Sequence, residues 1–219
     1  MTLAELIASF RQDAGDKAEP YLWADDLVKG WLNEAQQEAA VRRRLLYGSA
    51  PAINVTTAAG RTYPFTGLFE VTHATLQVSD LSAPASELGI VSRDGMDRFD
   101  AGWRTRPGVP ARLIVEDTQV VLGGAVERDY TLTLEGYRLP AAVLSAGADT
   151  PEIAPVHHRF LVHWALHRAY SNQDADTFDA ARAAREEVAF TAYFGSRPDA
   201  DLRKDARADM DHHTEAFWL

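Results

Sequence analysis

The stretch RRRLLYGSAPAINVTT, residues 42–57, decides the fold because the spacing of its apolar residues changes within it. Up to Tyr47 the apolar positions continue a helical pattern. Gly48 suits the left-handed backbone conformation that commonly ends a helix. From Ile53 onward, apolar positions alternate with smaller or polar ones, which is the period of a β-strand. The sequence therefore predicts a helix that ends here and a β-rich part that begins after Ser49.

The overall composition is that of an ordinary folded protein. The chain has 219 residues, of which 46% are hydrophobic and 25% charged, and it contains no cysteine. These fractions argue against disorder throughout, and the lack of cysteine excludes disulfides and thiolate metal sites. No apolar run approaches the roughly 18 residues that a membrane span needs. The beginning, MTLAELIASF, lacks a basic region, so we expect a helix there and no signal peptide.

The charge balance bears on possible partners. The chain carries 32 acidic and 22 basic side chains, which gives a net charge of −10. A chain this acidic is not expected to grip nucleic acid by its phosphates. The charge is compatible with a channel wall along which DNA slides without sticking.

Two helices are predicted before the change of pattern. Thr2 and Glu5 form a capping box, in which each side chain satisfies a free backbone amide of the other residue. One apolar face of this first helix follows, at Leu3, Leu6, Ile7 and Phe10. The second helix is predicted to start within residues 23–26 and to run to about Tyr47. Small residues on its apolar stripe would let another helix approach closely.

Residues 50–139 are predicted to form an antiparallel β module. The expected strands are 53–57, 62–66, 68–78, 112–116, 120–122 and 130–137. Asp117 and Thr118 form the turn of a hairpin within this module, and the last strand alternates apolar and polar residues. The stretch between residues 80 and 110 is expected to be irregular, apart from a short helix over 92–99.

Helices return after Pro140. One is predicted over residues 156–170, and the next is capped near Asp174 or Asp176 and stops at Gly195. The fold class that follows is α+β, with a four-helix core split by an antiparallel β-rich insertion and followed by an extended C-terminal tail. The predicted parts are residues 1–49 and 140–198 for the two halves of the helical core, 50–139 for the insertion and 199–219 for the tail.

The predicted tail is rich in charges and poor in apolar residues until its end. Such a segment cannot build a stable element alone. It closes on Ala216-Phe217-Trp218-Leu219, and apolar groups beyond a solvated segment can anchor in a groove on a partner. We interpret this end as a docking arm. The alternatives are an end that folds back on its own domain and an end that is frayed.

Histidines are the residues that could carry metal chemistry. His163 and His167 lie four positions apart on one predicted helix, which is the spacing of a zinc pair. A zinc protease would need glutamate at position 164, where Trp164 stands, so we favour histidines at a helix interface. The adjacent pairs 157–158 and 212–213 point in different directions and are interpreted as solvated.

Two charged groups also have a structural interpretation. Asp149 and Glu152 could form a catalytic acid pair only in a partly buried pocket, and we favour carboxylates near the positive start of a helix. Arg42, Arg43 and Arg44 could touch phosphate, but compensation of a helix dipole or packing against an acidic neighbour explains them equally well.

A series of short motifs along the chain is informative as a set. They are 31–36 (WLNEAQ), 136–140 (GYRLP), 149–153 (DTPEI), His158, 161–166 (LVHWAL), Ala169-Tyr170, Asp174, Phe190 and Phe194-Gly195. Their order and spacing over most of residues 1–205 resemble the head-to-tail adaptor (connector or neck) proteins of tailed bacteriophages. The β-rich insertion is the least recognisable part.

The resemblance implies a structural virion protein and not an enzyme. It implies a ring of about twelve copies mounted beneath the portal of a DNA-filled head, which joins the portal to the tail. The implied partners are the portal protein, a tail or nozzle (stopper) protein and further copies of the chain. Genomic DNA would pass through the channel without sequence-specific binding.

The same resemblance implies a protein made in the host cytoplasm and located in the virion neck, with no cofactor and no membrane association. The tail residues assigned to portal binding are Arg203, Lys204, Arg207, Phe217, Trp218 and Leu219.

Three other functions are compatible with the sequence. They are another head- or tail-completion protein, a metal-dependent enzyme that uses His163 and His167, and a bacterial interaction module. No phosphate-binding glycine loop, dinucleotide fingerprint or nucleophile elbow is present in the sequence.

Overall fold

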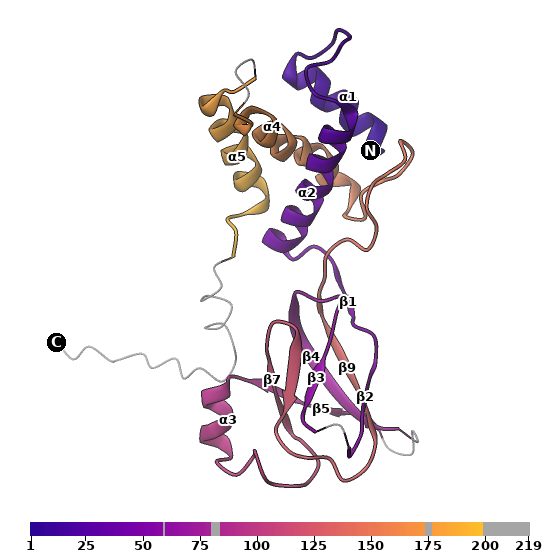
Figure 1. The fold of residues 1–219 in the computed structure, drawn as a ribbon, viewed down its shortest axis with the longest axis vertical. Helices are drawn as coiled ribbons and strands as arrows, with labels where there is room; N and C mark the ends of the chain where they lie inside the picture. The colour runs from indigo at the N-terminus through magenta and orange to yellow at the C-terminus, as the bar shows by residue number, and fades with distance from the viewer. Residues whose placement is uncertain (59, 80–83, 174–176, 199–219) are drawn as a thin grey trace, which may run out of the picture. The chain divides into compact units, whose positions relative to one another are not determined.

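The computed structural model describes residues 1–58, 60–79, 84–173 and 177–198 (Figure 1). Its contacts divide these residues into two compact units. Met1–Leu46 and Arg138–Arg197 form the helical unit, and Tyr47–Tyr137 forms the β unit. The protein is therefore of the α+β class, as the sequence predicts.

The described part of the helical unit contains α1 (Leu3–Ala14), α2 (Asp25–Arg43), the 3₁₀-helix η1 (Pro155–Phe160), α4 (Leu161–Ser171) and α5 (Ala180–Phe194). The predicted capping box is confirmed at the start of α1. Glu5 N donates to Thr2 Oγ1 (3.3 Å), and Thr2 N donates to Glu5 Oε2 (2.9 Å). α4 packs against α1, α2 and α5.

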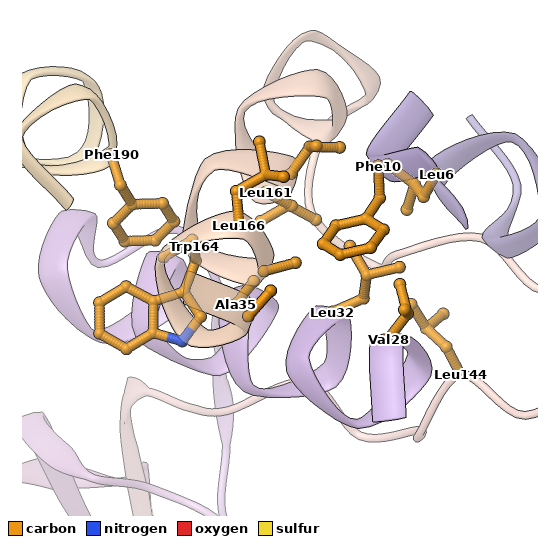
Figure 2. Packing of buried hydrophobic residues seen from close by; sticks show 14 of the residues in the cluster. Leu6, Phe10, Val28, Leu32, Ala35, Leu144, Leu161, Trp164, Leu166 and Phe190 are labelled. Carbon is orange, nitrogen blue, oxygen red and sulfur yellow. The ribbon is translucent and has the colours of Figure 1, made fainter. Parts of the chain in front are cut away.

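One hydrophobic core joins these helices, and Figure 2 shows its centre. Leu6 and Phe10 come from α1, Val28, Leu32 and Ala35 from α2, Leu161, Trp164 and Leu166 from α4, and Phe190 from α5. Each of these side chains is at most 8% exposed. Because α4 contributes buried residues on nearly all of its sides, it forms the middle of the unit.

The predicted end of the second helix was wrong. α2 stops at Arg43, and Arg44 takes the left-handed conformation (φ 51°) that the sequence had assigned to Gly48. Leu45 and Leu46 pack against the helical core. Because this packing requires the chain to leave the helical path, α2 ends before Gly48. Gly48 lies instead in a β-strand.

Two further helix boundaries differ from the prediction. The helix expected over residues 156–170 begins as η1, with Pro155 at its start, and becomes α-helical only at Leu161. The last helix is capped by Asp179, whose side chain accepts from Arg182 N (2.9 Å). The predicted caps, Asp174 and Asp176, lie outside the described residues.

The β unit contains two sheets. Their strands are β1 (Tyr47–Ser49), β2 (Ile53–Val55), β3 (Thr62–Pro64), β4 (Glu70–Val78), β5 (Ser86–Glu87), β6 (Gly89–Val91), β7 (Arg112–Val115), β8 (Gln119–Leu122) and β9 (Tyr130–Tyr137). The first sheet has the order β1-β9-β4-β5, with β2 also paired to β9, and the second has the order β3-β8-β7-β6.

The central strands of the second sheet, β7 and β8, are buried on both faces. Leu113, Val120 and Leu122 join the core shared with the first sheet, whereas Ile114 and Val121 pack with Met96 and Trp103 below the short helix α3 (Arg93–Phe99). Burial on both faces explains why β7 and β8 are almost continuously apolar. The predicted hairpin and the short helix are confirmed.

The predicted antiparallel pairing is confirmed for six of the seven described strand pairs and was wrong for one. β6 pairs with β7 in parallel, with Ile90 opposite Leu113. Both β5 and β6 fall within the stretch that was expected to be irregular. Such short strands are set by the register of their neighbours and leave little periodicity in the sequence.

The β unit begins and ends at adjacent points of the chain. Tyr47 in β1 is paired with Tyr137 in β9. In the helical unit, Arg138 N donates to Leu46 O (2.9 Å). The two chain crossings are thus hydrogen-bonded neighbours, although about ninety residues separate them in sequence.

Candidate interaction surfaces

His163 and His167 lie on the side of α4 that contacts α5. His163 Nδ1 donates to Glu186 Oε2 (2.7 Å), and His167 Nδ1 donates to Ala183 O (3.0 Å). Both bonds tie α4 to α5, so the interpretation as interface histidines is confirmed. Among the residues that the structure describes, no three His, Cys, Asp or Glu side chains gather closely enough to hold a metal ion.

His158 is buried, and its interpretation as a solvated residue was wrong. The side chain is 2% exposed, its Nε2 donates to Ile153 O (2.8 Å), and its Nδ1 accepts from the Met1 amino group (2.8 Å). Burial is possible because both ring nitrogens have partners. The ring thereby joins the start of the chain to the loop before η1.

His157 is half-buried beside the end of α5. Its Nδ1 lies 3.1 Å from the Tyr193 hydroxyl oxygen. Burial, together with the positive charge of Arg43, lowers the pKa of His157. His212 and His213 lie outside the described residues.

Asp149 and Glu152 organise the loop before η1, so the assignment to a helix dipole was wrong. The Asp149 carboxylate accepts from the backbone N–H groups of Ser145 and Ala146 (both 2.8 Å), which lowers the pKa of Asp149. The Glu152 carboxylate forms an ion pair with Arg138, which lowers the pKa of Glu152. Both carboxylates close a loop and need no catalytic role.

Arg42 and Arg43 bind the C-terminal end of α5. Arg42 Nη1 donates to Thr191 Oγ1 (3.0 Å) and to the Gly195 carbonyl (3.4 Å), and Arg43 Nη1 donates to the Tyr193 carbonyl (2.7 Å). Carbonyls at a helix C-terminus lack intrahelical partners and carry partial negative charge. The arginines thus compensate the C-terminal end of α5 as well as that of their own helix.

Glu38 is buried between two guanidinium groups. Its side chain accepts from Arg42 Nε (3.1 Å) and from Arg197 Nη2 (2.6 Å), and the residue is 8% exposed. We call Glu38, Arg42, Arg43 and Arg197 the anchor cluster. Because Arg197 directly precedes the end of the described chain, the anchor cluster fixes the point from which the predicted tail continues.

α5 has a second apolar side, which we call its outer face. The face packed on α4 carries Ala183, Phe190 and Phe194. The outer face carries Ala181, Ala184, Val188 and Ala192, all exposed, with Val188 at 68%. A surface helix usually turns polar residues outward. The predicted helix runs through Ala181, Ala184 and Val188, but the sequence did not lead us to expect that they form an exposed face, although their spacing places them on one side of the helix.

The six residues predicted to bind the portal all lie outside the described residues. They are Arg203, Lys204, Arg207, Phe217, Trp218 and Leu219.

The polar clusters described above close loops and anchor helix ends. The profile of the SU10 adaptor protein family matches residues 1–212, and the chain belongs to this family. No curated protein matches the chain. The resemblance to phage head-to-tail adaptors is therefore confirmed.

Membership in the SU10 adaptor family indicates the general role of the chain. The family is one of structural phage adaptors, so the chain is a virion component that interacts with other capsid or tail proteins. Within the part of the chain that the structure describes, no helix is both long and apolar enough to cross a membrane.

Proposed function

We propose that the chain assembles into a ring of about twelve copies that joins the portal of the capsid to the tail and continues the DNA channel. The family match over residues 1–212 carries this proposal. The two compact units suit a division of labour, in which the helical units pack around the ring and the β unit faces tail components or neighbouring copies.

The outer face of α5 supports lateral packing of the helical units. Its alanines allow close approach of a second helix, and Val188 adds apolar area that is 68% exposed in the single chain. A ring needs a surface on each copy that only a neighbour can cover. The outer face meets that requirement.

The C-terminal segment is the proposed portal-binding arm. Its sequence combines Arg203, Lys204 and Arg207 with the apolar end Phe217-Trp218-Leu219. Ordering a flexible segment costs free energy, but the segment can cover a large surface once docked. The anchor cluster supports this role because it holds the root of the arm on α2.

The net charge of −10 fits a channel that DNA traverses. Like charges disfavour adhesion to the phosphate backbone, so the genome can pass without sequence-specific contacts.

The decisive experiment mixes the purified chain with rings of its cognate portal protein and follows assembly by negative-stain electron microscopy and mass photometry. We expect a monomer alone and a ring on the portal, because repeated weak contacts around the ring act together. Removing residues 199–219 is expected to abolish portal binding and to leave the helical content unchanged. Unchanged binding would refute the docking arm, and the same ring without portal at low micromolar concentration would refute templated assembly.

A further inference from the structure

The region around α3 is basic, although the chain as a whole is acidic. Between residues 93 and 112 the sequence has five arginines (93, 98, 104, 106 and 112) against three aspartates (94, 97 and 100), whereas the full chain has a net charge of −10. A local excess of this kind attracts acidic groups and repels basic ones. We call residues 93–112 the basic segment.

Not all of these arginines are neutralised by their neighbours. Ion pairs join Arg93 to Glu116, Arg104 to Asp97 and Arg106 to Asp100. Arg98 is exposed, and Arg112 lies over the ring of Phe99 with 4.4 Å between its Cζ and the ring centroid. Within the described chain, neither Arg98 nor Arg112 has a carboxylate partner. Their charge is available to a ligand.

A hollow of about 240 Å³ lies beside Arg112 and Arg106. It is lined by Met96, Asp100, Arg106, Pro107, Gly108, Val109, Ala111, Arg112, Gly123 and Gly124. Small-molecule sites usually have volumes of roughly 300–1,000 Å³. The hollow is smaller than these and suits one large apolar side chain.

Two glycines give the hollow its floor. A Cβ on Gly123 would lie 2.9 Å from the Met96 side chain, so the bare backbone lets Met96 pack tightly there. A Cβ on Gly124 would meet only Gly108 O (3.6 Å) and Arg106 O (3.7 Å), which are ordinary contacts. Space for a further side chain therefore remains above Gly124.

Two apolar side chains near Arg112 are exposed. Val109, which lines the hollow, is 60% exposed, and Phe99, whose ring lies under Arg112, is 54% exposed. Exposed apolar groups beside unneutralised charges are typical of a docking surface, in which the apolar groups supply affinity and the charges supply orientation.

We propose that this hollow binds an acidic peptide segment of another virion protein, which inserts one apolar side chain beside Val109 and Met96 while its carboxylates meet Arg112 and exchange with Asp100 for Arg106. The proposal rests on the proposed adaptor function and adds the chemistry of one partner. The hollow thus gives the β unit a defined docking role.

Nucleic acid fits these observations less well. Phosphate binding draws its affinity from many free cations, whereas three of the five arginines here are paired with carboxylates. A DNA duplex, unlike a peptide, also has no apolar side chain that could enter the hollow. The charge complementarity and the shape together favour an acidic peptide.

The test uses the full-length protein with ¹³C-labelled methionine methyl groups. The chain has three methionines. Met96 lies in the hollow, and Met1, in the helical unit, is an internal reference. The probes are a nine-residue peptide with four acidic residues on each side of a leucine, the same peptide with glycine in place of the leucine, a basic counterpart and a 20-base-pair duplex. We expect a saturable shift of the Met96 methyl resonance with the acidic leucine peptide alone.

Two variants test separately how the positive charge and the shape of the hollow contribute to peptide binding. Arg112→Glu is expected to weaken peptide binding about tenfold, whereas Arg185→Glu, the same charge change on exposed α5, leaves it unchanged. Gly124→Leu fills the hollow and is expected to abolish binding. Circular dichroism before titration shows that the Arg112 and Gly124 variants are folded.

Three results would overturn the proposal. They are the absence of any Met96 shift, equal binding of the leucine and glycine peptides, and a Met96 shift with the duplex but not with the peptide. Ring assembly on the portal is measured separately, and Gly124→Leu is expected to assemble normally. Failure of the hollow and failure of the adaptor function are therefore distinguishable.

Discussion

Gly136 in β9 shows how the absence of a side chain fixes a strand register. A Cβ at this position would lie 1.9 Å from Glu70 O and 2.9 Å from Val71 Cα. The neighbouring strand β4 has a register shift between Val71 and His73 at this point. The bulge brings the two backbones together, and glycine alone tolerates that distance.

Gly136→Ala is expected to lower the free energy of unfolding by about 3 kcal/mol or more, because the added methyl group forces the strands apart. The measurement is urea unfolding followed by circular dichroism. Gly30→Ala is the matched control. Gly30 lies within α2 with no atom within 4 Å of a new Cβ, so alanine there should stabilise the protein by up to about 1 kcal/mol. Equal effects of the two changes would contradict this account.

His157 makes stability depend on pH in an accessible range. Its pKa in the folded protein lies below the ordinary value of 6.5, so the unfolded chain binds the proton more readily. The free energy of unfolding should therefore fall as the pH drops through 6.5. His157→Gln should flatten this decline between pH 7.5 and 5.5 in urea titrations. Parallel curves for the two proteins would show that His157 does not contribute.

At the scale of elements, the features set by residues close together in the sequence were predicted correctly. The features set by packing or pairing with distant segments were not. The start of α1, the α3 helix and the β7–β8 hairpin follow from capping residues and alternation within a few positions. The end of α2 does not, because the packing of Leu45 and Leu46 overrides the signal of Gly48, five residues after the helix ends. The parallel partner of β7 is also a long-range choice.

The same distinction between local and long-range determinants applies to the residues of the interaction surfaces. His163 and His167 were assigned to a helix interface because Trp164 stands where a zinc protease needs glutamate, and both do bond across α4 and α5. His158 was misjudged because its partners, Met1 and Ile153, come from other segments. The hollow near α3 combines Met96 with Gly123 and Gly124 from beyond β8, a pairing that no local pattern reveals.

The outer face of α5 gives a prediction at this scale. Val188→Glu places a charge in the proposed lateral contact and should prevent ring assembly on the portal. Because Val188 is 68% exposed in the single chain, the free energy of unfolding should change by less than about 0.5 kcal/mol. Gln37→Glu, on an exposed position of α2, introduces the same charge and should assemble normally. Normal rings of the Val188 variant would exclude this face.

At the scale of the whole molecule, the β unit is predicted to be removable. Its ends, Tyr47 and Tyr137, are paired residues, so a short Gly-Ser linker can replace Tyr47–Tyr137 without stretching the helical unit. The shortened chain should unfold cooperatively and keep its helical circular dichroism, because the helical core uses no β-unit residue. Loss of cooperativity would show that the helical unit needs the insertion to fold.

The anchor cluster has a mechanical consequence. A pull on the chain beyond Arg197 reaches Glu38 and the carbonyl of Gly195, which is bound by Arg42, before it acts on the interior of α5. The load therefore passes into α2, whose residues Leu32 and Ala35 are fully buried against the other helices. A tether built in this way transmits tension to the centre of the helical unit and spares the last turn of α5 from being peeled away.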